Sequence, residues 1–142
     1  MSDWNAEKMY ELGTRHARIE TACDLEGTMA TLVEDPVYQL QPMGLCMRGQ
    51  DQVRRYYENL MQSFIPSTLG YTLISEWVNE SSVAQEYEIV VGVDAGRESH
   101  RVIGILWSDG GPLLGGERVY AGERIIRLMV GDLYDELQPI GS

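Results

Sequence analysis

The sequence is poor in positive charge, and this shortage limits the partners it can have. Lysine and arginine together number 11 against 22 aspartates and glutamates, so the formal net charge is -11 at pH 7. Nucleic acids and anionic membrane surfaces are bound mainly by basic side chains that neutralise phosphates. We therefore expect no nucleic-acid partner and no membrane partner. A neutral or cationic small molecule, or a second copy of the chain, fits this charge better.

Cysteine and histidine are also scarce, with two of each. Cys23 and Cys46 lack metal-ligand spacing, and they are expected to remain reduced thiols. His16 and His100 are too far apart in sequence for a His-x-His or His-x-x-x-His motif, which disfavours a histidine-built metal site. No Gly-x-Ser-x-Gly motif or phosphate-binding glycine loop is present. The sequence therefore predicts neither a metal nor a cofactor.

Long apolar runs are absent as well. A membrane-spanning helix needs about 20 consecutive apolar residues, and no segment of this chain approaches that length. The first residues show no basic segment followed by an apolar one, so no secretory signal is expected and the predicted location is cytoplasmic. With 142 residues, of which 44% are hydrophobic, the chain is predicted to form one domain over residues 1–142.

Helical periodicity marks three segments in the first half of the chain. One helix is predicted over residues 4–23, because apolar residues and one histidine recur there at steps of three and four: Met9, Leu12, His16, Ile19 and Cys23. Asp24 is a suitable N-cap for a second, short helix that runs through Val33. The segment Glu34-Asp35-Pro36 should end that helix. A short strand is expected over residues 37–40, and a third helix over residues 51–64.

Strand character dominates the second half. Runs rich in β-branched and aromatic residues cover 71–78, 83–93, 100–107 and 117–120, with polar turn residues between them. Residues 124–130 are compatible with either a continuation of the last of these strands or a helix. Helices that are separate in sequence from an antiparallel meander predict an α+β domain, with the helices packed on one face of the sheet.

Several segments, taken in order, resemble the nuclear transport factor 2-like superfamily, and its SnoaL-like members in particular. The segments are Asp24-Leu25-Glu26-Gly27, the run from Leu32 to Tyr38, the run from Arg48 to Tyr57, and Gly116-Glu117-Arg118-Val119-Tyr120. Known members include ketosteroid isomerase and polyketide cyclases. The resemblance implies a cone-shaped roll, in which a curved sheet wraps around N-terminal helices. It also implies an apolar pocket at the open end of the cone and a homodimer that pairs the outer faces of the sheets.

The resemblance to ketosteroid isomerase can be carried over residue by residue. The oxyanion-hole tyrosine of that enzyme falls on His16, and its catalytic aspartate falls on Leu40, or on Gln41 if the register slips by one. The protonated aspartate of its oxyanion hole falls on Ile105, or on Gly104 with a similar slip. Enolisation of a ketosteroid needs a carboxylate base. Steroid isomerisation is therefore not expected of this chain.

Three residues are candidates for catalysis. His16 can donate a hydrogen bond or act as a general acid or base in the pocket, since imidazole titrates near neutral pH. The alternative is a core histidine whose hydrogen bonds are satisfied by the backbone. Tyr38 or Glu117 would assist His16 in the first case. Replacement of His16 by phenylalanine is expected to keep the fold, because the two rings have similar volumes.

Further residues are candidates for ligand binding. Gln41 completes a polar trio with His16 and Tyr38, and Met43 lies in the loop expected at the pocket mouth. Strand residues that could wall an apolar ligand or share in acid–base chemistry are Trp77, Glu88, Trp107 and Tyr120. Packing in the core or at a dimer interface, and exposure on an outer sheet face, are the alternatives for these residues. His100 is expected at a solvent-exposed or dimer-edge position.

Three functions remain open from the sequence. The first is acid–base catalysis of the isomerase, cyclase or hydrolase type on a hydrophobic cyclic or polyketide-like small molecule. The second is a non-catalytic binding module for an apolar ligand, and the third is a structural dimerisation domain. A homodimer is expected in each case, because both faces of the predicted strands carry large apolar residues and one layer of helices covers only one face.

Overall fold

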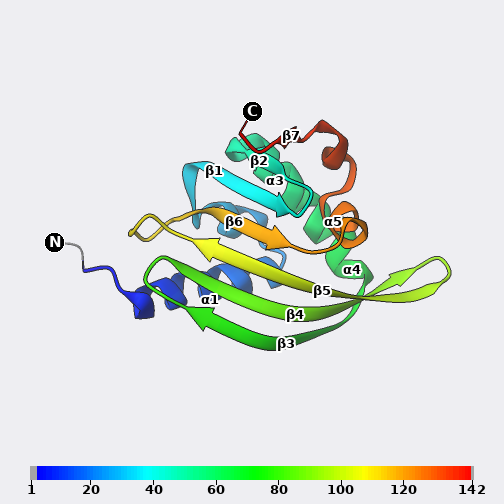
Figure 1. The fold of residues 1–142 in the computed structure, drawn as a ribbon, viewed down its shortest axis with the longest axis horizontal. Coiled ribbons are helices and arrows are strands. Elements are labelled where there is room, and N and C mark those ends of the chain that lie inside the picture. Colours follow the sequence, from blue (N-terminus) through cyan, green and yellow to red (C-terminus); the bar gives the residue numbers. More distant parts are fainter. Residues whose placement is uncertain (1–2, 142) are drawn as a thin grey trace.

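The computed structural model describes residues 3–141, which form an α+β fold (Figure 1). Its strands are β1 (Leu32–Gln41), β2 (Leu45–Arg48), β3 (Thr68–Val78), β4 (Ser82–Val93), β5 (Gly96–Trp107), β6 (Leu114–Tyr120) and β7 (Gln138–Pro139). Its helices are α1 (Ala6–Thr21), α2 (Leu25–Met29), α3 (Gly49–Asn59), α4 (Ile65–Ser67) and α5 (Glu123–Val130). A π-helical turn, Leu60–Phe64, joins α3 to α4, and a 3-10 helix, Gly131–Glu136, follows α5.

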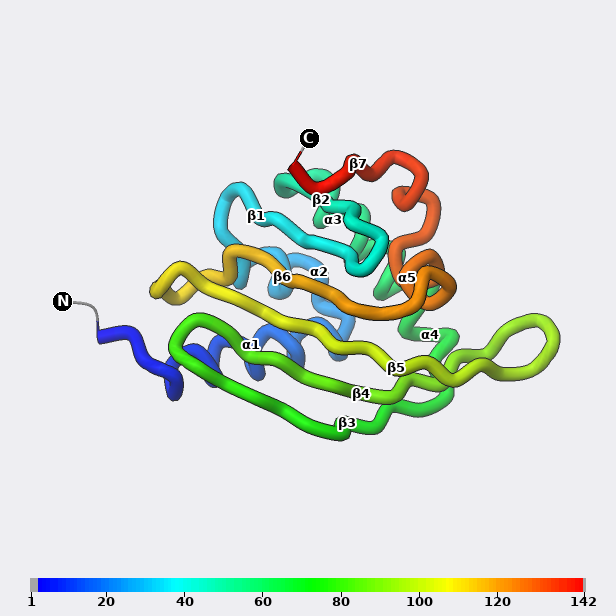
Figure 2. The backbone as a smooth tube through the Cα atoms, in the orientation of Figure 1, coloured from blue at the N-terminus to red at the C-terminus, as the bar shows by residue number. Residues whose placement is uncertain are grey.

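All seven strands form one open, curved sheet in the order β3-β4-β5-β6-β1-β2-β7. The strands β3 to β6 make the predicted antiparallel meander, and β1 joins the sheet parallel to β6. Figure 2 shows α1, α2 and α3 behind this sheet, while the β4–β5 hairpin extends beyond it. The predicted α+β class, with helices on one sheet face, is confirmed.

Strand pairing fixes which residues face the helices. Val83 lies opposite Leu106 and Tyr87 lies opposite Val102, and these side chains point to the helix-covered face, called the inner face here. The next residue along each strand points to the outer face, where Ala84 pairs with Ile105. Odd-numbered residues of β4 and even-numbered residues of β5 therefore contribute to the inner face.

The predicted first helix is confirmed, although α1 is shorter than residues 4–23. The side chain of Asn5 caps its start by accepting a hydrogen bond from the Lys8 amide at 2.9 Å. The helix ends before Cys23, whose positive φ of 57° breaks the helical path and leaves its side chain exposed. Gly13 lets α1 approach β4 closely, because a Cβ there would lie 2.9 Å from a methyl group of Val83.

The predicted extent of the second helix is wrong. Asp24 is its N-cap, as expected, and accepts a hydrogen bond from the Gly27 amide at 2.9 Å. However, α2 ends at Met29, and Leu32 already pairs with Leu114 in the sheet. Pro36 therefore lies inside β1, where the register with β6 is irregular and the missing amide of proline is tolerated. The strand thus begins at residue 32 instead of residue 37.

The predicted third helix is confirmed in position, but it has a more complex end. The regular α3 passes into the π-helical turn and then into α4, so helical structure continues past the expected stop at Ile65-Pro66. Its buried residues Val53, Tyr56 and Tyr57 belong to the main core. Residues 124–130, left open between strand and helix, lie in α5. In residues 3–141 no helix is both long enough and apolar enough to span a lipid bilayer.

Candidate functional site

A cavity of about 380 Å³ lies between α1 and the inner face of the sheet. Such a volume is sufficient for a small organic molecule. The cavity is lined from α1 by His16, Ala17, Arg18, Glu20 and Thr21, and from the strands by Tyr71, Val83, Gln85, Tyr87, Gly104, Leu106 and Glu117. Its wall is therefore partly apolar, and three acid–base side chains (His16, Glu20 and Glu117) converge on it.

Two of these acid–base groups come from successive turns of α1. His16 and Glu20 are four residues apart, which places them on the same side of the helix. The Nε2 atom of His16 lies 3.3 Å from Oε2 of Glu20. Only 1% of the His16 side chain is exposed, against 27% for Glu20. The histidine thus forms the floor of the cavity, and the glutamate lies nearer to its opening.

The other nitrogen of His16 has a partner that defines its protonation. Nδ1 lies 2.7 Å from the hydroxyl of Thr31, and this hydroxyl donates its proton to the Thr28 carbonyl at 2.7 Å. A threonine hydroxyl has one proton, so Thr31 must accept from His16, and Nδ1 must carry hydrogen. In the neutral imidazole, Nε2 is then the acceptor, and it is this nitrogen that lies beside Glu20.

Two tyrosines extend the network away from Nε2. The Tyr57 hydroxyl lies 3.0 Å from Nε2 of His16, and the Tyr38 hydroxyl lies 2.5 Å from that of Tyr57. With neutral His16, Tyr57 donates to the imidazole and accepts from Tyr38. Burial raises the pKa of both tyrosines well above the ordinary value, so Tyr38 and Tyr57 keep their phenolic protons at neutral pH. A proton added at Nε2 would instead be donated to Glu20 or Tyr57.

This network changes the expectation for His16→Phe. The phenylalanine ring fills a similar volume, but the donor of Tyr57 would lose its acceptor in a fully buried position. A buried polar group without a partner costs about 1–3 kcal/mol. We therefore expect the variant to have a lower free energy of unfolding by about that amount in urea titrations. The triple variant His16→Phe/Tyr38→Phe/Tyr57→Phe should recover part of the loss, because it removes both buried phenolic donors, whereas removing Tyr57 alone would leave Tyr38 unpaired. No recovery in the triple variant would contradict this hydrogen-bond network.

Glu117 is the third acid–base group, and its carboxyl group has no protein partner. It extends from β6 over Gly104, where an added Cβ would lie 2.9 Å from Oε2 of Glu117. Within residues 3–141 it makes no hydrogen bond and no ion pair. Burial, and secondly the negative charge of Glu20, raise the pKa of Glu117 to about 8. At neutral pH this carboxyl group is therefore mostly protonated and able to donate a hydrogen bond into the cavity.

The arrangement suits proton transfer better than metal or covalent chemistry. Two titratable groups can act as acid and base when their environments keep one of them protonated and the other unprotonated at the same pH. Here a protonated Glu117 faces the same cavity as a histidine–glutamate pair whose Nε2 can take up a proton. In the part of the chain that the structure describes, no group of three or more His, Cys, Asp or Glu side chains could hold a metal ion.

The structure brings the three predicted catalytic residues together. His16 and Glu117 line the cavity, and Tyr38 connects to His16 through Tyr57. Tyr38 itself is fully buried beneath the cavity. It lies beside Glu117 because β1 and β6 are parallel neighbours in which these two residues are paired. The irregular register after Leu32 is what sets this pairing.

The predicted ligand-binding residues lie outside the cavity wall. Trp77 and Tyr120 are on the outer face, with exposed fractions of 52% and 42%. Glu88 is also on that face, near Arg101, and the ring of Trp107 packs over Gly115. The main reason is strand alternation, since each of these side chains points away from the inner face.

The last two predicted ligand-binding residues and the second histidine also lie elsewhere. Gln41 is at the end of β1, where its carbonyl accepts a hydrogen bond from Ala121 at 3.0 Å. Met43 packs against the core near β2. His100 is partly buried on β5 and lies 3.0 Å from Glu98.

Sequence reasoning missed Glu20, Tyr57, Tyr71 and Gln85. The signal for Glu20 was available, since it follows His16 by one helical turn. Tyr57 is fully buried on α3, and a buried phenol needs a hydrogen-bond partner, which His16 provides. Tyr71 and Gln85 are on the inner face of β3 and β4, and no pattern in the strands indicated which face this was.

Known structures with the same arrangement identify the fold. An uncharacterised bacterial protein with a cystatin-like fold from Silicibacter pomeroyi is 14% identical, with 90% of this chain and 86% of that chain covered and a TM-score of 0.68. An NTF2-like protein of unknown function from Cytophaga hutchinsonii is 11% identical, with 80% of this chain and 99% of that chain covered and a TM-score of 0.66. The chain has the nuclear transport factor 2-like fold. The predicted resemblance is thereby confirmed at the level of the fold.

A further neighbour is a candidate ketosteroid isomerase from Kribbella flavida. It is 20% identical, with 87% of this chain and 82% of that chain covered and a TM-score of 0.62. No known protein-family profile matches the sequence, and no curated protein matches it either. At these identities the likeness establishes only the fold of this nuclear transport factor 2-like chain.

Proposed function

We propose that this protein is an acid–base enzyme that moves a proton on a small, mainly apolar cyclic molecule with a carbonyl or hydroxyl group. The observation that carries this proposal is the carboxyl group of Glu117. It faces a cavity of about 380 Å³, lacks a protein partner among the described residues, and has a pKa of about 8. A partly buried carboxyl group that faces a cavity without a protein partner has little structural use, but it is well suited to give or take a proton near neutral pH.

In the proposed reaction, Glu117 is the acid and the His16–Glu20 pair is the proton acceptor. Glu117 donates to the oxygen of the substrate, while the pair takes a proton from a neighbouring carbon or hydroxyl. The proton at Nε2 of His16 would be stabilised by Glu20 at 3.3 Å. Tyr57 and Tyr38 hold the imidazole in position through their hydroxyl groups.

The ketosteroid isomerase pattern offers a useful contrast. Leu40 is a buried aliphatic residue at the position of its base, so isomerisation of a ketosteroid by that route is still not expected. At the position of its protonated aspartate, Gly104 leaves a space that the carboxyl group of Glu117 occupies from the neighbouring strand. A protonated carboxyl group thus stands in the same part of the cavity, supplied by a different strand.

A ligand screen with two readouts tests the proposed function. Thermal-shift assays with steroids, aromatic polyketides and cyclic terpenoids should give at least one ligand that raises the melting temperature. Liquid chromatography with mass spectrometry should then detect a cyclised or hydrolysed product, and NMR should detect an isomerised product, whose mass is unchanged. A ligand that binds in the cavity but is never converted would favour the binding module instead. No ligand in any class would favour a structural domain.

We also propose a homodimer that pairs the outer sheet faces. That face carries Trp77, Ile103, Ile105 and Tyr120 in adjacent cross-strand rows. Light scattering at micromolar concentration should give twice the mass of the chain. Ile105→Glu should make the protein monomeric, because a charge would be buried in the interface. Ser99→Glu, at the far end of the same face, should leave it dimeric. A monomeric parent protein would contradict the proposal.

A further inference from the structure

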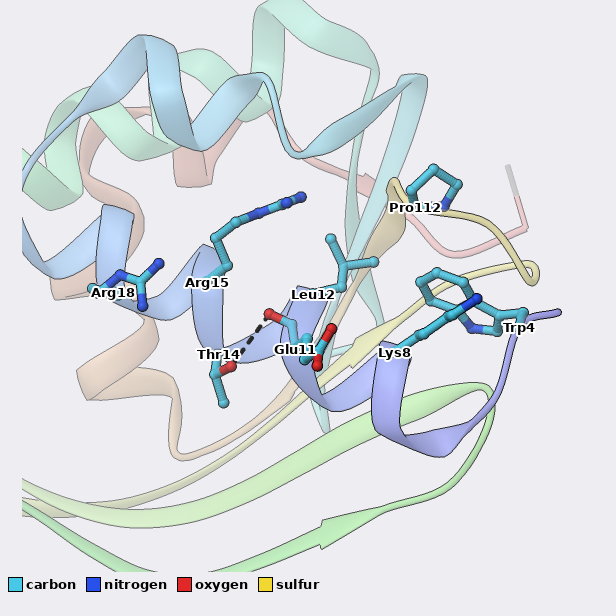
Figure 3. A pocket seen from close by; sticks show the side chains of 8 residues that line it. All are labelled: Trp4, Lys8, Glu11, Leu12, Thr14, Arg15, Arg18 and Pro112. Carbon is cyan, nitrogen blue, oxygen red and sulfur yellow. Dashed lines mark hydrogen bonds between the residues drawn. The ribbon is translucent and has the colours of Figure 1, made fainter.

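A second concave surface runs along the side of α1 that faces away from the sheet. This groove has a volume of about 510 Å³, and Figure 3 shows Trp4 and Pro112 at one end and Arg15 and Arg18 at the other. Its charged residues from α1 recur at steps of three and four: Lys8, Glu11, Arg15 and Arg18. That spacing places them along one line of the helix surface.

The charge of this groove is opposite to that of the whole chain. Lys8, Arg15 and Arg18 face a single carboxylate, that of Glu11, whereas the chain carries a net charge of -11. None of the three cations has an ion-pair partner among residues 3–141. By contrast, five other arginines pair with acidic side chains: Arg54, Arg55, Arg101, Arg124 and Arg127. The groove therefore concentrates basic groups that the protein itself does not neutralise.

Arg18 connects the groove to the cavity, because it lines both. A guanidinium group matches a carboxylate or a phosphate with two parallel hydrogen bonds. Arg15, one turn earlier on α1, adds a second guanidinium group to the lining of the groove (Figure 3). A ligand whose ring lies in the cavity could thus extend an acidic substituent past Arg18 into the cation-rich end of the groove.

We propose that the substrate carries an anionic group, a carboxylate or a phosphate, which Arg15 and Arg18 bind in the groove while its apolar ring occupies the cavity. This inference rests on the proposed function, and it narrows the substrate class from neutral cyclic molecules to cyclic organic acids. The net charge of the chain pointed to neutral or cationic ligands, but the field at a binding site is set by the charges nearest to it.

A matched set of ring compounds tests this recognition without any turnover. The probes are 2-naphthoate, 2-naphthyl phosphate and 2-naphthol, which share one ring system and differ in charge. Calorimetric titration at low salt should give dissociation constants for the two anions that are about tenfold lower than for the alcohol. Raising the salt concentration to about 0.5 M should remove most of this advantage, since the arginines are solvent-exposed.

Variants locate the anion. The double variant Arg15→Gln/Arg18→Gln should bind the two anions about tenfold more weakly, and its affinity for 2-naphthol should equal that of the parent protein. Arg97→Gln is the control, because Arg97 is also exposed and unpaired in the described chain but lies at the start of β5, on the β4–β5 hairpin. Methyl NMR signals of Val83 and Leu106 should shift with each anion, which places the ring in the cavity. The proposal would be overturned if 2-naphthol bound as tightly as the anions. It would also be overturned if Arg97→Gln lost as much affinity for the anions as Arg15→Gln/Arg18→Gln.

The outcome separates this inference from the proposed function. If a neutral substrate is converted and the anions bind no better than 2-naphthol, the anion site is rejected while the acid–base function stands. If the anions bind through Arg15 and Arg18 with the ring in the cavity, the recognition is supported whether or not a product is detected. Glu88→Gln should leave the affinity for 2-naphthoate within about twofold, because Glu88 lies on the outer face of the sheet and lines neither the cavity nor the groove.

Discussion

Glu117→Gln should lower kcat/KM for the proton-transfer reaction by about 10²–10⁴-fold. The amide has the size and shape of the carboxyl group, so the cavity over Gly104 keeps its form. It cannot give up a proton to a substrate oxygen, and this loss is the reason for the expected effect. Steady-state kinetics on the substrate found by screening will measure it. Glu88→Gln is the matched control, since Glu88 lies on the outer face of the same sheet and outside the cavity wall.

The pH dependence of the rate distinguishes the two roles that Glu117 could have. Its pKa of about 8 separates a protonated form at lower pH from an ionised form at higher pH. If Glu117 is the acid, kcat/KM should fall as pH rises through about 8. If it is the base, kcat/KM should rise over the same interval. This change of kcat/KM near pH 8 should be absent in Glu117→Gln. If it persists unchanged in the variant, another group is responsible for it.

Much of the fold could be predicted because local patterns and tertiary structure agree over most of the chain. The apolar spacing in α1 and the strand runs of the meander each admit one regular structure. The segment after Asp24 is the exception, since Leu32 and Val33 continue a helical spacing as well as they begin a strand. Pairing of Leu32 with Leu114, far away in the sequence, decides between the two. No local pattern contains that information.

The candidate site was less predictable than the fold. His16 and Glu117 were found because a titratable residue on an apolar stripe or strand is unusual. The strand aromatics were not resolved, because alternation does not say which face meets α1. Alternation would also place Tyr71 and Trp77 on the same face of β3, and the irregular register between Leu73 and Ser75 puts them on opposite faces. The cavity is lined by Tyr71 and Tyr87, and Trp77 and Trp107 lie on the opposite face. A one-residue change of register would exchange these sets.

The same carboxyl group should also make stability depend on pH in a direction opposite to that of an ordinary buried ion pair. The pKa of Glu117 rises from 4.5, the value expected in the unfolded chain, to about 8 in the native protein. Between these values the native state holds more protons than the unfolded state. The free energy of unfolding therefore falls as pH rises across this window, by up to about 1.4 kcal/mol per pH unit, and the contribution levels off above it.

Glu117→Gln isolates this contribution, because glutamine does not titrate while the other cavity groups, His16, Arg18 and Glu20, are unchanged. Urea unfolding between about pH 5.5 and pH 9 should show the variant gaining stability relative to the parent as pH rises, with a plateau once Glu117 is ionised in both states. Glu20→Gln should move the plateau to lower pH, since it removes the negative charge that contributes to the raised pKa of Glu117. Burial is the larger cause, so the pKa should remain above its ordinary value in that variant. A stability difference between Glu117→Gln and the parent that stays constant across this range would mean that Glu117 is solvated and ionised throughout. Its role as the acid would then be lost.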